Sequence, residues 1–244
     1  MNLERLAASL AGWISDRVRE AGAVGTVVGV SGGVDSAVVL ALCKAALKER
    51  VLGLILPCRS RPEDLDDAAL VLRHFGVRGE TIVLDHAYEE MLRAVTAGGS
   101  TDSRDLATAN IVPRLRMTVL YFYANKLNYL VAGTGNRSEI EVGYFTKHGD
   151  GGVDILPIGG LVKSQVRALA GHLGVPARII EKPPSAGLWP GQTDEGEMGL
   201  TYHEIDEYLL TGRGDEAVVA RIRRMHERSE HKRSRPPVAV VHPD

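Results

Sequence analysis

The sequence G-V-S-G-G-V-D-S-A, residues 29–37, decides how the rest of the chain is interpreted. Residues 26–28 before it and Val30 within it are β-branched, as in a strand buried inside a parallel sheet. From Val34 onward the chain is apolar in the manner of a packed helix. The stretch is therefore predicted to form the turn between a strand and a helix.

This turn has the chemistry of an anion site. The adjacent glycines Gly32 and Gly33 let the backbone turn sharply, and the free N–H groups of the following helix point at whatever occupies the turn. Phosphate is the natural occupant. Ser31 and Ser36 can donate to phosphate oxygens, and Asp35 can hold a hard divalent cation. The alternative is an ordinary turn in which the Asp and Ser side chains only cap the helix.

The spacing separates this turn from two better-known phosphate loops. No Lys follows the glycines, so the G-x-x-x-x-G-K-[ST] pattern is absent, and there is no G-x-G-x-x-G fingerprint. The string S-G-G-V-D-S instead resembles the signature loop of the N-type ATP pyrophosphatases, which include NAD, GMP and argininosuccinate synthetases and tRNA-thiolating enzymes. The resemblance implies cleavage of ATP between its α- and β-phosphates and transfer of AMP to an oxygen of the substrate. It leaves the substrate open.

Size and composition fit a single catalytic domain. A chain of 244 residues, 44% hydrophobic and 25% charged, is enough for one α/β domain over residues 1–244 and too short for a second catalytic one. The net charge of -2 argues against a nucleic-acid surface. No apolar run reaches membrane-spanning length and no signal layout opens the chain. We expect a cytoplasmic protein with neither a nucleic-acid nor a membrane partner.

The cysteines and histidines show no metal or redox pattern. Cys43 falls within the helix after the turn and Cys58 just past a strand, with no C-x-x-C spacing, so both are expected to be buried small residues. His226 and His231 are five positions apart and do not share a helix face. A disulfide, a catalytic thiol and a histidine metal site are not expected.

Strands and helices alternate along the chain. This alternation predicts an α/β fold, a three-layer parallel sheet flanked by helices in a flavodoxin-like or Rossmann-like order. Helices are expected at 3–21, from 34 onward, at 63–75, 106–127, 162–173, 202–210 and 215–228, and strands at 26–30, 51–56, 81–84 and 129–132. In that order the first and fourth strands are neighbours, so the loops that follow them face one crevice. Pro113 must kink its helix or mark a late start.

Two stretches are expected to be irregular. Residues 97–105 are small and polar, typical of a mobile loop. Residues 183–199 hold too many Pro and Gly for regular structure, and a loop of that length in a compact domain usually has a function, here that of an active-site cover.

Motifs further along the chain narrow the family. Residues 143–167 read G-Y-F-T-K-H-G-D-G-G-V-D-I-L-P-I-G-G-L-V-K-S-Q-V-R. Together with G-T-G-N-R-S-E from Gly133, residues 184–199, Y-x-x-I-D from Tyr202 and E-H-K-R from Glu230, they closely resemble ammonia-dependent NAD synthetases, of the adenine nucleotide alpha hydrolase-like fold. The resemblance implies a ligase that converts nicotinic acid adenine dinucleotide, ATP and ammonia into NAD, AMP and pyrophosphate through an adenylated carboxylate, the last step of NAD biosynthesis.

The resemblance also implies which residues form the site. Asp35 and Lys163 would be catalytic, and Asp35 and Glu139 would hold Mg²⁺, a hard ion that carboxylate oxygens suit. ATP would be bound by Gly29, Val30, Ser31, Gly32, Gly33, Val34, Asp35, Ser36, Thr134, Lys163 and Ser185. The deamido dinucleotide would be bound by Arg114, Lys147, Asp154, His231 and Lys232. Ser185 stands where many relatives have Thr, which keeps the hydroxyl. Taken alone, Arg114 and Lys163 could be solvated helix residues and Glu139 a cap.

The family is further expected to form a homodimer with the dinucleotide at the subunit interface. The apolar helix at 111–129 is the candidate interface, and its cluster Tyr121-Phe122-Tyr123 is either part of that interface or ordinary core. Glutamine-dependent relatives carry an N-terminal amidase domain with catalytic Cys, Glu and Lys. Because the loop here begins at residue 29, free ammonia or ammonia from a partner protein is expected.

Two alternatives remain at this stage. One is another N-type pyrophosphatase, such as a tRNA-modifying enzyme; the absent catalytic cysteines, the lack of a basic surface and the downstream motifs count against it. The other is a non-catalytic module that senses ATP or AMP. That class would be expected to lack the metal carboxylates, and Asp35 and Glu139 are both present.

Overall fold

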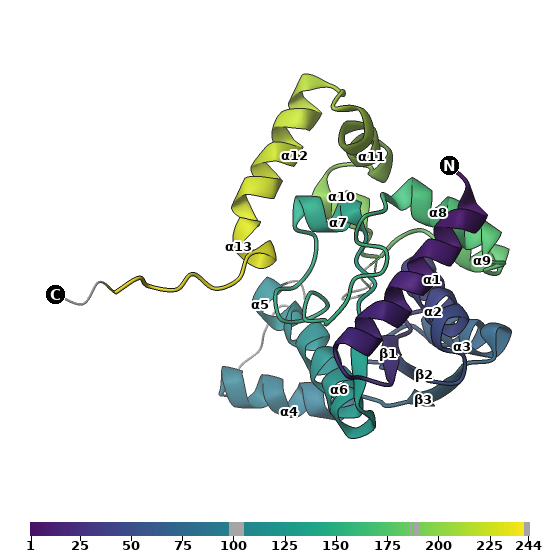
Figure 1. The fold of residues 1–244 in the computed structure, drawn as a ribbon. Helices are drawn as coiled ribbons and strands as arrows, with labels where there is room; N and C mark the ends of the chain where they lie inside the picture. Colours follow the sequence, from purple (N-terminus) through teal and green to yellow (C-terminus); the bar gives the residue numbers. More distant parts are fainter. Residues whose placement is uncertain (98–104, 186, 188–190, 242–244) are drawn as a thin grey trace.

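The fold is built on a parallel sheet. In this computed structural model, which describes residues 1–97, 105–185, 187 and 191–241, four parallel strands lie in the order β3-β2-β1-β4 (Figure 1). The strands are β1 Gly25–Gly29, β2 Val51–Ile55, β3 Arg78–Thr81 and β4 Tyr129–Ala132. The predicted fold class is confirmed, and so is the predicted contact between the first and fourth strands.

Helices cover both faces of the sheet and extend beyond it. They are α1 Leu3–Glu20, α2 Val34–Leu47, α3 Pro62–Phe75, α4 Asp85–Thr96, α5 Leu106–Ala109, α6 Ile111–Leu127, α7 Arg137–Val142, α8 Lys163–His172, α9 Ala177–Ile180, α10 Asp194–Met198, α11 Tyr202–Thr211, α12 Glu216–Arg228 and α13 Glu230–Arg233. One apolar core joins α1, α2, α3, α8 and α9 to one face of the sheet, and a second joins α4 and α6 to the other. This is the predicted three-layer arrangement.

A third, smaller apolar cluster lies beyond the carboxyl end of β4. It is formed mainly by α7, α10, α11 and α12, with Met198, Ile205 and Ile222 at its centre. In Figure 1 these helices stand together above the sheet. The chain enters this cluster through the loop between β4 and α7, so the cluster closes over the edge where β1 and β4 end.

Two predicted elements differ from the structure at their ends. The strand expected at 81–84 is wrong, because the ladder pairs Leu52 with Arg78 and ends at Ile55 and Thr81. β3 is an edge strand, where charged residues such as Arg78 and Glu80 are tolerated. The prediction relied on an apolar run and therefore placed the strand too late in the sequence. The helix expected at 106–127 is divided into α5 and α6, and Pro113 lies in the first turn of α6, which confirms a late start rather than a kink.

The stretch at 183–199 was predicted to be irregular, and this is wrong for part of it. It contains α10, which begins after Thr193, whose hydroxyl accepts from the Gly196 N–H at 3.2 Å. Acidic residues fill its first turn, where a helix favours negative charge. Capping therefore overcomes the poor helix propensity of Gly196. Residues 186 and 188–190 of this stretch, and 98–104 of the predicted loop at 97–105, lie outside the described residues.

In the described part of the chain no helix is both long and apolar enough to cross a bilayer. The sequence does not predict helix α4, because most of its residues are exposed and only Tyr88 is fully buried.

We predict that both thiols are unreactive in the native protein. Cys43 and Cys58 are 0% and 2% exposed, and burial raises the pKa of Cys43 to about 12 and that of Cys58 to about 11. The thiolate, which is the reactive form, is then scarce at pH 8. Titration with a disulfide reagent at pH 8 should detect no thiol in the native protein and both in denaturant. A thiol that reacts rapidly without denaturant would contradict this prediction.

Candidate active site

The first loop is shaped by its own hydroxyls. The Ser36 hydroxyl donates to the Gly33 carbonyl at 2.9 Å and lies 3.2 Å from the Ser31 hydroxyl. Gly32 has φ +78°, and a Cβ there would lie 2.7 Å from the carbonyl oxygen of Asp64. Only glycine fits this position, because the loop presses against α3 in a left-handed conformation. The loop therefore keeps its shape without a bound ligand.

The second loop, which follows β4, is joined to the first. Asn136 caps α7: its side-chain oxygen accepts from the Glu139 N–H at 3.0 Å, and Glu139 Oε2 accepts from the Asn136 N–H at 3.3 Å. The side-chain amide of Asn136 donates to Asp35 Oδ1 at 3.1 Å. The prediction that the two loops face each other is confirmed.

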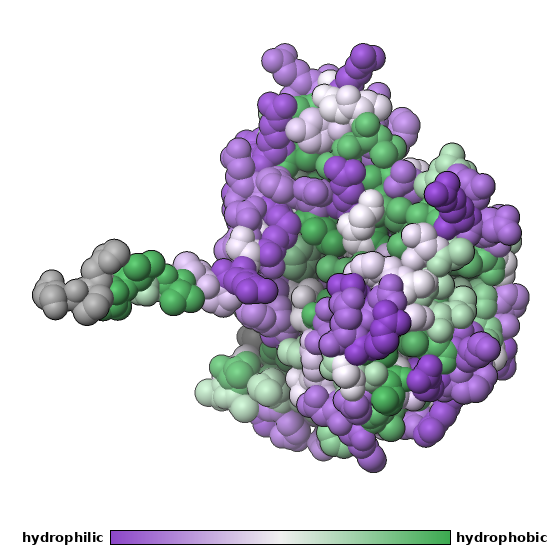
Figure 2. All heavy atoms as spheres, viewed as in Figure 1, coloured by the Kyte–Doolittle hydropathy of each residue, from purple (hydrophilic) through white to green (hydrophobic). Residues whose placement is uncertain are grey.

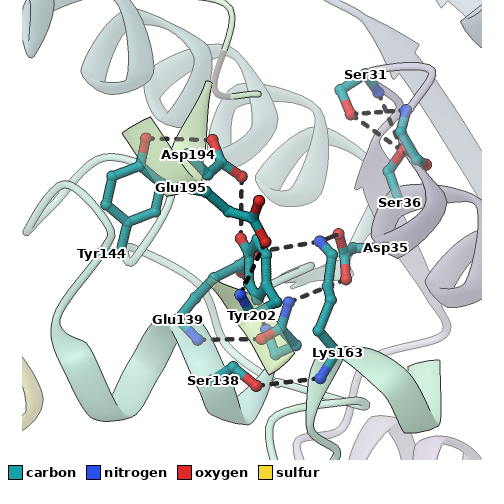
Figure 3. A network of polar contacts seen from close by, with 12 residues as sticks. Ser31, Asp35, Ser36, Ser138, Glu139, Tyr144, Lys163, Asp194, Glu195 and Tyr202 are labelled. Carbon is teal, nitrogen blue, oxygen red and sulfur yellow. Dashed lines mark hydrogen bonds and ion pairs between the residues drawn. The ribbon is translucent and has the colours of Figure 1, made fainter. Parts of the chain in front are cut away.

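Lys163 completes the centre of the site. It is the first residue of α8 and is 2% exposed. Its ammonium donates to Asp35 Oδ2 and lies 3.4 Å from Glu139 Oε1 (Figure 3). The structure thus brings together three residues that were predicted from separate motifs, up to 128 positions apart in sequence.

The charges in this centre perturb one another. Burial raises the pKa of Glu139 to about 7, the Lys163 ammonium opposes that rise, and the neighbouring Asp35 carboxylate adds to it. Burial alone would lower the pKa of Lys163, but the carboxylates of Asp35 and Glu139 outweigh burial and raise it. Lys163 is therefore a cation here, whereas burial makes the charged form of Glu139 less favourable than that of an exposed carboxyl group.

Two tyrosines and two further carboxylates extend the network toward α10. The Tyr202 hydroxyl lies 3.0 Å from Glu139 Oε1 and 2.9 Å from Asp194 Oδ2. The Tyr144 hydroxyl lies 3.2 Å from Asp194 Oδ1 (Figure 3). It also lies 2.8 Å from Glu197 Oε2. Burial and these carboxylates raise the pKa of both tyrosines, so both hydroxyls stay protonated. Asp194 lies within the stretch at 183–199, which is thereby tied to Glu139.

Sequence reasoning assigned no role to Tyr144, Tyr202 or Asp194. Tyr202 opens the Y-x-x-I-D motif, and that motif was the only signal in the sequence that could have drawn attention to it.

The two remaining ATP candidates lie on loops. Thr134 is half-buried in the loop between β4 and α7. The Ser185 hydroxyl donates to the Gln192 carbonyl at 2.8 Å and accepts from the Gly187 N–H at 3.1 Å. These bonds shape the loop that carries Ser185 and do not join it to Lys163.

The candidates for dinucleotide binding fall into two groups. Arg114 and Lys147 lie together with the C-terminal residues His231 and Lys232: the guanidinium of Arg114 donates to the Lys147 carbonyl at 3.4 Å, and the Lys147 ammonium donates to the His231 carbonyl. The Lys232 ammonium donates to two carbonyls of the 143–145 segment, each at 2.8 Å. Asp154 lies apart from them, where it accepts from the Val131 N–H at 2.7 Å and from the Tyr121 hydroxyl at 3.0 Å.

The donor set suits a hard divalent cation. Asp35 and Glu139 both approach the Lys163 ammonium, so their oxygens already converge on one positive charge. In the described residues no group of three or more His, Cys, Asp or Glu side chains has the arrangement of a metal site. Magnesium is commonly held by one or two carboxylates plus substrate phosphates and water, so these two residues fit it.

Comparisons with known proteins agree along the whole chain. The NAD synthase family model matches residues 6–236. An NH(3)-dependent NAD(+) synthetase of Carboxydothermus hydrogenoformans is 52% identical over 99% of this chain and 99% of its own. The structure of NMN synthetase from Francisella tularensis superposes with a TM-score of 0.92 at 41% identity, covering 98% of this chain and 99% of that one. The NH3-dependent NAD synthetase of Campylobacter jejuni superposes with a TM-score of 0.81 at 29% identity, over 98% and 100%.

We predict that Lys163→Met destabilises the protein by about 2 kcal/mol, because it leaves the half-buried carboxylates of Asp35 and Glu139 without their buried cation. The matched control is Lys44→Met, which breaks a pair whose Glu49 side chain is 86% exposed and should cost less than about 1 kcal/mol. Urea unfolding followed by circular dichroism measures both. Equal midpoints for the two variants would show that Lys163 does not hold the carboxylates together.

Proposed function

The chain belongs to the NAD synthase family, and on that premise we propose that it amidates nicotinic acid adenine dinucleotide with ammonia and ATP, giving NAD, AMP and pyrophosphate. The enzyme is a ligase that forms a C–N bond. The observation that carries the proposal is the Asp35–Lys163–Glu139 centre, which lies between two glycine-rich loops at the end of a parallel sheet.

The reaction needs such a centre for a physical reason. A carboxylate at neutral pH is a poor electrophile, so ammonia cannot displace oxide from it directly. Transfer of AMP to the carboxylate makes a mixed anhydride whose leaving group is AMP. To reach that step the enzyme must align two anions that repel each other and stabilise the charge on the phosphoryl group as it moves.

The first loop is the proposed site of the ATP polyphosphate. The backbone N–H groups of residues 29–36 and the N-terminus of α2 favour an anion. An ammonium has three N–H donors, and Asp35 and Glu139 engage two of those of Lys163, so a third can be given to a phosphate oxygen. Thr134 and Ser185 would supply further hydroxyl donors. Asp35 and Glu139 would hold Mg²⁺, which neutralises polyphosphate charge when bound.

The dinucleotide is proposed to bind at the residues that were predicted for it. Arg114 and Lys147 are cations beside the C-terminal His231 and Lys232, as an anionic dinucleotide requires, and Asp154 would accept hydrogen bonds from its hydroxyl groups. Because the Lys232 ammonium already donates hydrogen bonds to two backbone carbonyls, its main role is to hold α13 against the 143–145 segment. We propose a cytoplasmic location, where ATP is available.

A second acceptor follows from one comparison. The neighbour with a TM-score of 0.92 is an NMN synthetase, which points to the deamidated mononucleotide as an alternative substrate. The carboxylate and its adenylation would be the same, so the centre at Lys163 does not distinguish the two. The distinction must come from contacts to the adenylyl half, which only the dinucleotide carries.

A homodimer is also proposed. Phe122 on α6 is 60% exposed, while its neighbours Tyr121 and Tyr123 are half-buried and bonded within the chain. Helices α4 and α5 add further exposed apolar residues, Met91, Val95 and Leu106. Figure 2 shows hydrophobic residues gathered at the lower left of the molecule, where Figure 1 places α4. An exposed apolar patch of this kind is typical of a protein interface.

For activity, we predict that purified protein forms NAD from nicotinic acid adenine dinucleotide, ATP and Mg²⁺ with ammonium but not with glutamine. Asp35→Ala should lower kcat by about 100-fold or more, because it removes a carboxylate from the charged centre. Asp16→Ala, at an exposed ion pair on α1, should keep full activity. Production of AMP without NAD would mean that the acceptor is wrong. The same assay with nicotinic acid mononucleotide decides, by kcat/KM, between the two acceptors.

For assembly, Phe122→Asp should convert a dimer into a monomer, because a carboxylate would have to be buried at the interface. The control is Leu210→Asp on α11, which is 52% exposed and lies outside the proposed interface. Light scattering coupled to size-exclusion chromatography measures the mass of each. An unchanged mass for Phe122→Asp, or a monomeric unsubstituted protein, would contradict the proposed interface.

A further inference from the structure

Asp206 is a buried carboxylate that holds three hydrogen bonds at the back of the site. It lies on α11 and is 4% exposed. Its Oδ1 accepts from the Ser138 hydroxyl at 2.6 Å and from the Lys163 N–H at 3.3 Å, and its Oδ2 accepts from the Ser164 N–H at 2.7 Å. All three donors are neutral, so the carboxylate is stabilised here by hydrogen bonds and not by an ion pair.

These bonds cap α8 from outside. The residue before that helix is Val162, whose side chain cannot accept a hydrogen bond, although a helix needs acceptors for its first N–H groups. Asp206 supplies two of them from another helix. Its negative charge also lies at the positive end of the α8 dipole, which stabilises a terminus whose first side chain is a cation.

The same carboxylate also holds α7. Ser138 precedes Glu139 in that helix and is fully buried, and its hydroxyl both donates to Asp206 and accepts from the Lys163 N–H at 3.1 Å. The backbone that carries Glu139 and the backbone that carries Lys163 therefore meet at Asp206. A change at this point would alter the distance between the two side chains that form the centre.

The face of α11 around Asp206 also contacts the side-chain ends of Glu139 and Lys163. Tyr202 is four residues earlier on the same helix face. Its hydroxyl lies 3.0 Å from Glu139 Oε1, and the Lys163 ammonium lies 4.8 Å from its ring centroid. One helix thus contacts the side chains of Glu139 and Lys163 through Tyr202, and the Lys163 N–H and the Ser138 hydroxyl through Asp206.

We propose that Asp206 is a positioning residue for the adenylation step: it fixes α8 against α7, so that the Lys163 ammonium and the Glu139 carboxylate stand at their working separation. Asp206 does not itself reach the substrates. The proposal rests on the function proposed above. It gives a task to Asp206, the last residue of the Y-x-x-I-D motif.

The test compares two aspartates that cap helices. Asp206→Asn replaces one acceptor oxygen by an N–H donor that faces the amides of α8. The matched control is Asp215→Asn at the exposed N-cap of α12, whose carboxylate accepts from the Ala217 N–H at 2.9 Å. Steady-state kinetics with ATP, acceptor and ammonium are measured for both variants well below their melting temperatures. ATP binding is measured separately by calorimetry without acceptor.

We expect Asp206→Asn to lower kcat by about 10- to 100-fold, the usual effect of removing a residue that orients a catalytic group. The ATP dissociation constant should stay within about threefold, because the first loop is intact. Asp215→Asn should keep kcat within about twofold. A kcat of Asp206→Asn equal to that of the unsubstituted protein, or an equal loss in both variants, would overturn the proposal. If the unsubstituted protein does not amidate either acceptor, the proposed function fails instead.

Should Asp206→Asn not fold, Ser138→Ala decides the question, because it removes only one hydroxyl. We expect a loss in kcat of about 3- to 10-fold, and unchanged kcat would overturn the proposal. Where both single variants fold, the double variant should lose less than the product of the two single losses, since both act on the same link.

Discussion

The rest of the structure is arranged around one cluster of charged side chains. Asp35 and Glu139 lie in the first turns of α2 and α7, and Lys163 is the first residue of α8, so three helix N-termini converge on one point. The carboxylates are favoured there, and the ammonium is disfavoured by about 0.3–1 kcal/mol per helix terminus. A buried ion cluster is weak evidence for stability, since desolvation offsets the attraction. The convergence is better explained by what it attracts: a polyphosphate is stabilised by the same positive helix ends.

The sequence predicted those parts of the site that lie within motifs, because their geometry depends on residues close together in the chain. A glycine pair followed by Asp35 dictates a turn whose geometry depends on neighbouring residues, and the apolar strands require a parallel order that puts two such turns together. The contacts of Asp206 could not be predicted from the sequence, because its partner Ser138 is 68 positions away and the residues around each give no sign of the other. The edge strand β3 was misplaced for a related reason, since its pairing with β2 and not its own composition makes it a strand.

Helix α3 has two tasks that the sequence does not suggest. Its backbone at Asp64 leaves space only for Gly32, which fixes the shape of the phosphate loop. Its carboxylates Asp64 and Asp67 also accept from the Lys182 ammonium at 2.7 and 2.6 Å, directly before the stretch at 183–199. The far end of that stretch is tied to the tyrosines through Asp194. The described residues on both sides of 188–190 are thus held by other elements, α3 on one side and the two tyrosines on the other.

Helix α8 belongs to two packing units at once, and this explains why a helix outside the sheet can govern the chemistry. Its residues Val166 and Leu169 are buried in the large core with α1 and α2, whereas its first N–H groups are held by Asp206 of α11. The small cluster around Ile205 shares few apolar residues with that core. Local unfolding free energies differ between such units. Loosening the small cluster would therefore release the N-terminus of α8 and separate Lys163 from Glu139 while the sheet stays folded, so the catalytic geometry depends on this cluster as well as on the sheet that places Asp35.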